Sequence, residues 1–140
     1  MTNEELCALA REAAKGAYCP YSHCTVGAAL LTVDGRVYTG CNIENAAYGS
    51  TICAERVAVF KAVSDGCRAF AALAVAGGRD GRLSGLYPPC GACRQVLREF
   101  CPLTMPVLLV TGETTFQTTT LGELLPYSFG PEQVNGNENV

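Results

Sequence analysis

Apolar and polar positions near the amino terminus follow the period of a helix. Its apolar residues are Leu6, Leu9, Ala10, Ala13, Ala14 and Ala17. Thr2 and Glu5 form a capping box that marks where such a helix begins. The sequence Cys19-Pro20 favours extended backbone, so we expect this helix to end near Gly16 or Tyr18.

The next forty residues change to the patterns of strands and of a buried helix. Residues 25–33 are apolar and partly β-branched, and Asp34-Gly35 is a hairpin turn signal before residues 36–40 return as an alternating strand. Residues 42–51 have little periodicity, which indicates a long loop. Residues 52–63 read as a buried helix.

The remaining chain alternates further strands and helices. We expect strands at 69–76, 107–111 and 116–120, helices at 90–100 and 121–125, and a polar, glycine-rich loop at 77–85. The apolar run 69–76 is typical of a strand covered on both faces. This order predicts an α/β protein, a three-layer α/β/α sandwich with a mixed five-stranded sheet. We expect one domain over residues 1–134 and a disordered tail over 135–140.

Charge and cysteine content narrow the class of partner. The net charge is -3, and Lys15 and Lys61 are the only lysines in 140 residues, so the sequence lacks the clustered cations that a nucleic acid requires. Nine cysteines are an odd number, and we find neither a signal peptide nor an apolar run of roughly 18 residues that could span a membrane. We expect a cytoplasmic protein with reduced thiols, a small neutral substrate, and no nucleic-acid or membrane partner.

Three cysteines stand at predicted helix starts and predict a metal site. Cys53 begins one helix, while Cys90 and Cys93 form a CxxC at the start of another, after two prolines. Helix N-termini favour thiolates, and a CxxC there can share one tetrahedral ion. The sole histidine is His23, so a site with several histidine ligands is excluded. Three ligands leave one position for water, which is typical of a catalytic zinc.

Arg56 and Glu55, which follow Cys53 closely in the sequence, could assist a bound metal without being its ligands. Arg56 follows Cys53 by three residues on the same helical face, so it can hydrogen-bond the sulfurs and offset their negative charge. Glu55 lies outside the ligand set but within reach of a metal-activated water, as a proton carrier would. A lone CxxC is often redox-active or structural, but ligand-x-Glu followed by Pro-Cys-x-x-Cys is the signature of zinc deaminases in its three-cysteine form.

The sequence also resembles the small homotetrameric cytidine deaminases, from Tyr18 to Phe129. The stretches that carry the resemblance are Pro20 to Ser22, Val26 to Leu30, Gly40 to Tyr48, Cys53 to Arg56, Pro89 to Gln95, and Glu123 to Pro126 before Phe129. The resemblance implies one Zn²⁺ per subunit and a homotetramer whose active sites lie at subunit interfaces. It implies hydrolytic deamination of cytidine and deoxycytidine to uridine and deoxyuridine.

The resemblance also implies roles for individual residues. Asn42 and Glu44 would hold the ribose 3′-hydroxyl, and Ala54 would contact the base through its backbone. Ala46, Tyr48 and Phe129 would complete the pocket of a neighbouring subunit.

The residues themselves support part of these roles. Asn42 and Glu44 are two residues apart after a strand, and their carboxylate would repel a phosphate, which favours a nucleoside over a nucleotide. Alternatively, this pair satisfies its own loop backbone, and Tyr48 and Phe129 are ordinary core aromatics.

One departure from the family bears on substrate choice. Cys24 stands where the family usually has a phenylalanine beside the pyrimidine. A deaminase for another aminopyrimidine nucleoside, such as a blasticidin-type antibiotic, therefore stays open as an alternative. A non-catalytic zinc module with a fourth protein ligand is a further alternative, and a nucleic-acid editing deaminase is disfavoured by the charge.

Overall fold

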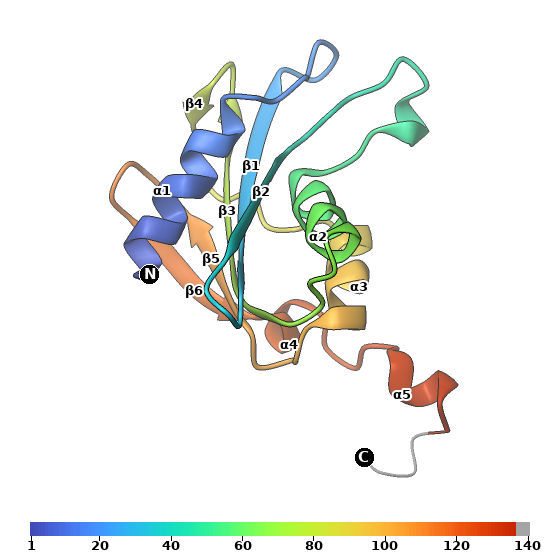
Figure 1. The fold of residues 1–140 in the computed structure, drawn as a ribbon. Coiled ribbons are helices and arrows are strands. Elements are labelled where there is room, and N and C mark those ends of the chain that lie inside the picture. Colours follow the sequence, from blue (N-terminus) through green and yellow to red (C-terminus); the bar gives the residue numbers. More distant parts are fainter. Residues whose placement is uncertain (137–140) are drawn as a thin grey trace.

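A mixed β-sheet forms the centre of the structure, a computed structural model that describes residues 1–136. Its strands are β1 (Cys24–Thr32), β2 (Val37–Cys41), β3 (Phe70–Arg79), β4 (Arg82–Leu83), β5 (Pro106–Val110) and β6 (Phe116–Thr120). Five of them lie in the order β2-β1-β3-β5-β6, and the short β4 pairs with β3 (Figure 1). Only β3 and β5 are parallel neighbours, which makes the sheet mixed as predicted.

Helices cover both faces of this sheet. They are α1 (Asn3–Ala14), α2 (Ala54–Ser64), α3 (Gly91–Phe100), α4 (Leu121–Leu124) and α5 (Pro131–Val134), with a 3₁₀ turn, η1 (Tyr48–Ser50), in the long loop. Figure 1 shows α1 on one side of the sheet and α2 with α3 on the other. The predicted α/β/α sandwich is therefore confirmed.

Strand β3 shows why both faces are apolar. Leu73 and Val75 pack in the cluster that includes α2 and α3, whereas Ala72, Ala74 and Ala76 pack in the cluster with α1. Successive side chains of a strand point to opposite faces, so a strand buried on both sides has no polar alternation. This confirms the expectation for the apolar run 69–76, although the strand is longer, ending at Arg79.

The predicted loop over residues 77–85 was wrong in part. Asp80 and Gly81 both have positive φ, of 52° and 79°, and they turn β3 back into β4. Two consecutive residues with positive φ make the tight turn that joins antiparallel strands, and Asp-Gly is a preferred sequence for it. Asp80-Gly81 is therefore a hairpin turn with the same Asp-Gly sequence as Asp34-Gly35.

Two contacts place the start of α2 against the sheet. A Cβ on Gly40 of β2 would lie 2.3 Å from the Ala54 carbonyl oxygen, so only glycine allows this approach. Ile43 bridges Ile52 beyond the end of β2, which fixes the chain just before α2. The first turn of α2 therefore lies beside the end of β2.

The chain ends of the described region differ slightly from expectation. Thr2 caps α1 by accepting a hydrogen bond from the Glu5 N–H at 3.1 Å, as predicted, but α1 ends at Ala14, before Gly16. The polar segment after Gly130 contains the unexpected helix α5, capped at Asn135. The predicted tail at 135–140 falls largely on residues 137–140, which lie outside the described range.

Within residues 1–136, no helix has the length and apolarity to cross a bilayer.

Candidate active site

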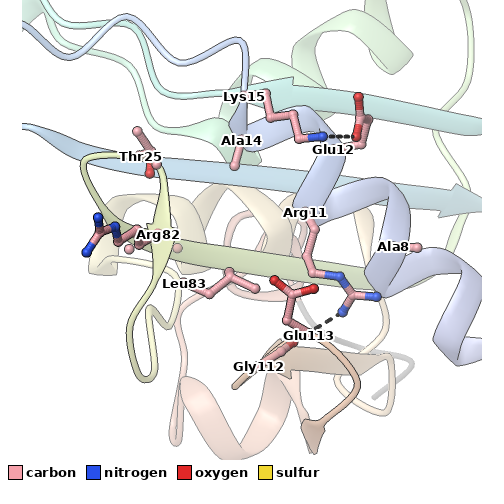
Figure 2. Close-up of a pocket in the computed structure, with 13 residues that line it drawn as sticks. Ala8, Arg11, Glu12, Ala14, Lys15, Thr25, Arg82, Leu83, Gly112 and Glu113 are labelled. Carbon is pink, nitrogen blue, oxygen red and sulfur yellow. Dashed lines mark hydrogen bonds and ion pairs between the residues drawn. The ribbon is translucent and has the colours of Figure 1, made fainter.

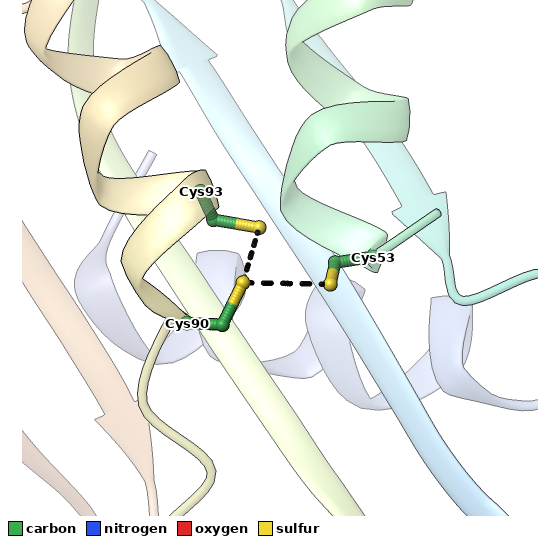
Figure 3. Close-up of side chains that lie close together, drawn as sticks. All are labelled: Cys53, Cys90 and Cys93. Atoms are coloured by element: carbon green, nitrogen blue, oxygen red, sulfur yellow. Dashed lines mark hydrogen bonds between the residues drawn. The ribbon is translucent and has the colours of Figure 1, made fainter. Parts of the chain in front are cut away.

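Two helix starts bring three cysteine sulfurs together. Cys53 is the N-cap of α2, Cys90 is the N-cap of α3, and Cys93 lies in the first turn of α3. Figure 3 shows the three side chains facing one another between the two helix tips. The Cys90 sulfur lies 3.7 Å from that of Cys53 and 3.6 Å from that of Cys93.

These separations fit one tetrahedral zinc ion. Zinc–sulfur bonds of about 2.3 Å in tetrahedral geometry place neighbouring sulfurs about 3.8 Å apart. All three sulfurs lie within 4.8 Å of one another. No other His, Cys, Asp or Glu joins this group in residues 1–136, so the donors match a three-ligand site with one position left for water.

The helix ends and the half-buried Arg56 favour the thiolate form of Cys53. The pKa of the Cys53 thiol is lowered because it accepts hydrogen bonds from Cys93 and Arg56, and the pKa of Cys93 is raised because that pair shares one proton and is buried. The helix N-termini add partial positive charge at Cys53 and Cys90. Metal binding replaces such protons, so the arrangement suits a cation.

Arg56 reaches the sulfur cluster from α2. Its Nη2 donates a hydrogen bond to the Cys53 Sγ at 3.4 Å. Its buried Nε has no hydrogen-bond partner among the described residues. A half-buried guanidinium that donates to a thiolate supplies the positive charge that a three-sulfur site lacks.

Glu55 is a buried carboxyl group beside the cluster. Only 3% of the residue is exposed, and this burial, with the nearby Cys53 charge, raises the pKa of Glu55 to about 7. A carboxyl group with its pKa near neutrality can both accept and return a proton. Glu55 lies in the first turn of α2, the residue at which the sequence predicts a proton carrier.

Asn42 and Glu44 form a second polar group at the end of β2. Asn42 is buried, its Oδ1 accepts from the Val26 N–H at 2.9 Å, and its Nδ2 donates to the Cys24 carbonyl at 2.7 Å. These contacts match the alternative in which the pair satisfies backbone groups. They still leave one amide hydrogen and one lone pair of Asn42 without a partner in these bonds.

Glu44 is held by the preceding loop. It accepts hydrogen bonds from the N–H groups of Tyr21 and Ser22, at 2.9 and 3.2 Å, and from the Ser22 hydroxyl. The pKa of its carboxyl is lowered chiefly by the bond from the Ser22 hydroxyl, so it stays charged at neutral pH. Ser22 was not singled out from sequence as a site residue, although its Pro-Tyr-Ser motif was noted.

The remaining predicted substrate residues do not gather in one pocket of the chain. Tyr48 is 58% exposed and Phe129 is 61% exposed, which excludes the alternative that these two residues are core aromatics. Ala46 is exposed as well. Ala54 is fully buried at the start of α2, next to Cys53. The Tyr48 hydroxyl donates to Glu44 at 3.5 Å, and so connects the long loop to the polar group.

Cys24 faces the same side of the sheet as the cysteine cluster. It lies at the start of β1, two residues before Val26, which packs against the cluster formed with α2 and α3. Its cross-strand partner is Arg79, whose Nη1 lies 3.7 Å from the Cys24 sulfur. A guanidinium therefore stands beside the residue that replaces the usual aromatic ring.

A separate cavity lies on the other face of the sheet and is unrelated to the cysteines. It has a volume of about 540 Å³ between α1 and the β3–β4 hairpin. Figure 2 shows Lys15 paired with Glu12, at 2.8 Å, and Arg11 directed to the Gly112 carbonyl. Because Lys15, Glu12 and Arg11 already have partners and the metal-ligand cluster found within residues 1–136 lies elsewhere, we place the candidate active site at the cysteines instead.

Comparison with known proteins agrees with this site. Residues 1–109 match the family model described as the cytidine and deoxycytidylate deaminase zinc-binding region. The chain is 52% identical to a cytidine deaminase of Sporosarcina psychrophila over 96% of both chains, and 48% identical to one of Halalkalibacterium halodurans over 96% of this chain and 99% of that one. The crystal structure of cytidine deaminase from Burkholderia pseudomallei is 46% identical with a TM-score of 0.85, covering 92% of this chain and all of that one. The chain therefore belongs to the family of zinc-binding cytidine and deoxycytidylate deaminases.

Proposed function

We propose that this protein hydrolyses cytidine and deoxycytidine to uridine and deoxyuridine, releasing ammonia. The observation that carries the proposal is the cysteine cluster at two helix starts with the buried carboxyl of Glu55 beside it. The test is the loss of cytidine absorbance with release of ammonia by the purified, zinc-loaded protein. A protein that binds zinc but turns over no aminopyrimidine would contradict the proposal and favour the non-catalytic zinc module.

The metal would be held by Cys53, Cys90 and Cys93. When bound, zinc supplies Lewis acidity that makes water a nucleophile near neutral pH. Arg56 hydrogen-bonds the Cys53 sulfur and so reduces the negative charge that three thiolates place on the ion. The absence of a fourth ligand within residues 1–136 supports a catalytic site over the non-catalytic zinc module.

Glu55 would move the protons of the reaction. It removes one proton from the attacking water and delivers it to the ring nitrogen next to carbon 4. A bond forms between that carbon and the water oxygen. Glu55 then passes the second water proton to the amino group, the carbon–nitrogen bond breaks and ammonia leaves. Its buried position, with a pKa raised to about 7, supports both directions of transfer.

Asn42 and Glu44 would select a nucleoside through its ribose 3′-hydroxyl. The charged Glu44 carboxylate accepts a hydroxyl proton well and repels a phosphate. The free donor and acceptor of Asn42 remain for the sugar. Ala54 would contact the base through its backbone.

Replacing Glu44 with glutamine should weaken discrimination by the 3′-hydroxyl. A hydrogen bond to a charged group stabilises by about 1.5–3 kcal/mol, so the wild type should favour 2′-deoxycytidine over 3′-deoxycytidine by roughly tenfold or more in kcat/KM. We expect Glu44→Gln to reduce that ratio to a few-fold. Comparing two substrates in one variant controls for altered folding, because misfolding lowers both rates alike. An unchanged ratio in the variant would show that Glu44 does not bind the sugar.

Arg56→Gln should slow turnover while the protein keeps its metal. Without the guanidinium, the three sulfurs donate more charge to the ion and its water becomes a weaker acid. Changes next to metal ligands typically lower activity by about 10–100-fold. The measurement is kcat with zinc content by elemental analysis, and Arg68→Gln, at an exposed arginine, is the matched control. Full activity in Arg56→Gln would contradict the charge-offset role.

A homotetramer completes the proposed site. Ala46, Tyr48 and Phe129 are exposed, and each would reach the pocket of a neighbouring copy, with Tyr48 near the 5′ side and Phe129 against the ring. Light scattering should therefore give four times the mass of one chain. A monomer with full activity would contradict this assembly.

The proposal also covers the domain boundaries and the cellular compartment of the protein. We infer a single domain over residues 1–134 with a tail at 135–140. A cytoplasmic location is supported by the nine cysteines, none of which forms a disulfide bond.

The substrate assay also tests the alternative raised by Cys24. Rates for cytidine, deoxycytidine and a blasticidin-type nucleoside should be compared on the same preparation. The family relationship favours cytidine, and we expect it to react fastest.

A further inference from the structure

The outer face of α3 holds the carboxyl-terminal part of the described chain. Arg94 donates to the Leu124 carbonyl at 2.7 Å, and Gln95 donates to the Phe129 carbonyl at 2.9 Å. Arg98, one turn further, binds Ser128 and Glu132. The helix that carries Cys90 and Cys93 at its start thus also anchors residues 124–132.

Arg98 is the strongest of these anchors. It is only 8% exposed, and its Nε donates to the Ser128 hydroxyl at 2.8 Å. Its Nη1 and Nη2 donate to the two Glu132 oxygens at 3.1 and 2.6 Å, which is the paired geometry of the strongest charge-assisted bonds. A Cβ on Gly130 would lie 2.4 Å from the Arg98 Cζ, so the chain wraps closely around the guanidinium.

Phe129 lies between Ser128 and Glu132, the two residues that Arg98 hydrogen-bonds. Ser128 and Gly130 flank it, and its own carbonyl is held by Gln95. Its ring nevertheless stays largely exposed, beside a cavity of about 230 Å³ lined also by Glu99 and Val134. A backbone so firmly held with its aromatic ring presented outward is typical of a preorganised contact with another molecule.

We propose that Arg98 and Glu132 act as positioning residues that fix Phe129 for insertion against the nucleoside bound by a neighbouring copy of the chain. This inference rests on the proposed function, because it requires the composite site. Neither residue touches the substrate. By holding residues 128–132 in place before binding, they reduce the conformational entropy that is lost when the Phe129 ring enters the site.

The variant Glu132→Gln tests the clamp with little change of shape. We expect KM for cytidine to rise roughly three- to tenfold, while kcat stays within about twofold and zinc content is unchanged. The amide nitrogen of glutamine cannot accept, so one of the two bonds from Arg98 is lost and the other is made to a neutral oxygen. Ser128→Ala removes only one bond to Arg98 and should shift KM the same way by about two- to threefold. Glu4→Gln removes the same charge from an exposed residue of α1, on the other side of the sheet from α3, and should leave KM unchanged.

A double-mutant cycle separates positioning from a merely structural role. If the clamp acts through Phe129, then Glu132→Gln should add nothing to KM in a Phe129→Ala background. If the two substitutions raised KM independently, so that the double variant showed the product of the two single increases, the proposal would be overturned. An unchanged KM in both Glu132→Gln and Ser128→Ala would overturn it as well. A normal KM in Phe129→Ala would instead overturn the placement of Phe129 in the neighbouring site, and the clamp with it. Absence of cytidine turnover in the wild type would refute the proposed function itself.

Discussion

Replacing Glu55 with glutamine is expected to lower kcat for cytidine by about 10²–10⁴-fold, the range over which a general acid–base group contributes. Glutamine has nearly the same shape but neither accepts a proton from water nor returns one to the ring. Zinc content should stay at one ion per chain, because Glu55 is not among the three sulfur ligands. The measurements are steady-state turnover by absorbance and metal analysis of the same sample.

The glutamine variant should also fold at least as stably as the wild type. Glu55 is buried, and a neutral amide avoids the cost of burying a carboxylate. A thermal melt therefore tells a chemical defect from a folding defect, and Glu113→Gln, at an exposed carboxylate far along the chain, is the control. Wild-type turnover in Glu55→Gln would remove the proton-carrier role.

The variant Cys90→Ala is expected to lose both metal and activity. Cys90 lies between the other two sulfurs, at 3.7 and 3.6 Å, so two ligands at most remain without it. Zinc should fall from one ion per chain to near zero after dialysis, and turnover should fall below detection. Because a bound metal stabilises the folded state, the variant should also lose about 4 kcal/mol of stability at zinc concentrations a thousandfold above Kd.

The matched control for this variant is Cys41→Ala. Cys41 is a half-buried thiol on β2 outside the cluster, so it should keep zinc and turnover. Treating the wild type with a strong chelator should reproduce the loss of activity seen in Cys90→Ala, and added zinc should restore it. Retention of one zinc ion and full activity in Cys90→Ala would contradict the three-sulfur site.

Local spacing in the sequence was sufficient to predict which residues form the candidate metal site. Cys53 and Arg56 are three residues apart, and Cys90 and Cys93 likewise, so a single helical turn decides which side chains share a face. Thr2 with Glu5 and the apolar run of β3 were similarly readable, because caps and strand faces depend on neighbours within a few residues.

Long-range packing determined what the spacing could not. The meeting of Cys53 with Cys90 depends on how α2 and α3 lie across the sheet, and the order β2-β1-β3-β5-β6 is not encoded in any single segment. The exposure of Phe129 and the hydrogen bond from Arg98 to the adjacent Ser128, 30 residues later in the chain, could not be predicted either, because a charged residue in a helix gives no sign of its distant partner.

The sequence by itself therefore determined most of the elements, although not β4 or α5, through patterns within one helical turn or one strand. The same short-range patterns marked the candidate metal ligands and the candidate proton carrier. The tertiary structure alone decided that the three cysteine sulfurs converge, that Ser22 hydrogen-bonds Glu44, and that Tyr48 and Phe129 are exposed. The physical reason is that periodicity and capping act between near neighbours, whereas convergence depends on the burial of apolar faces summed over the whole sheet.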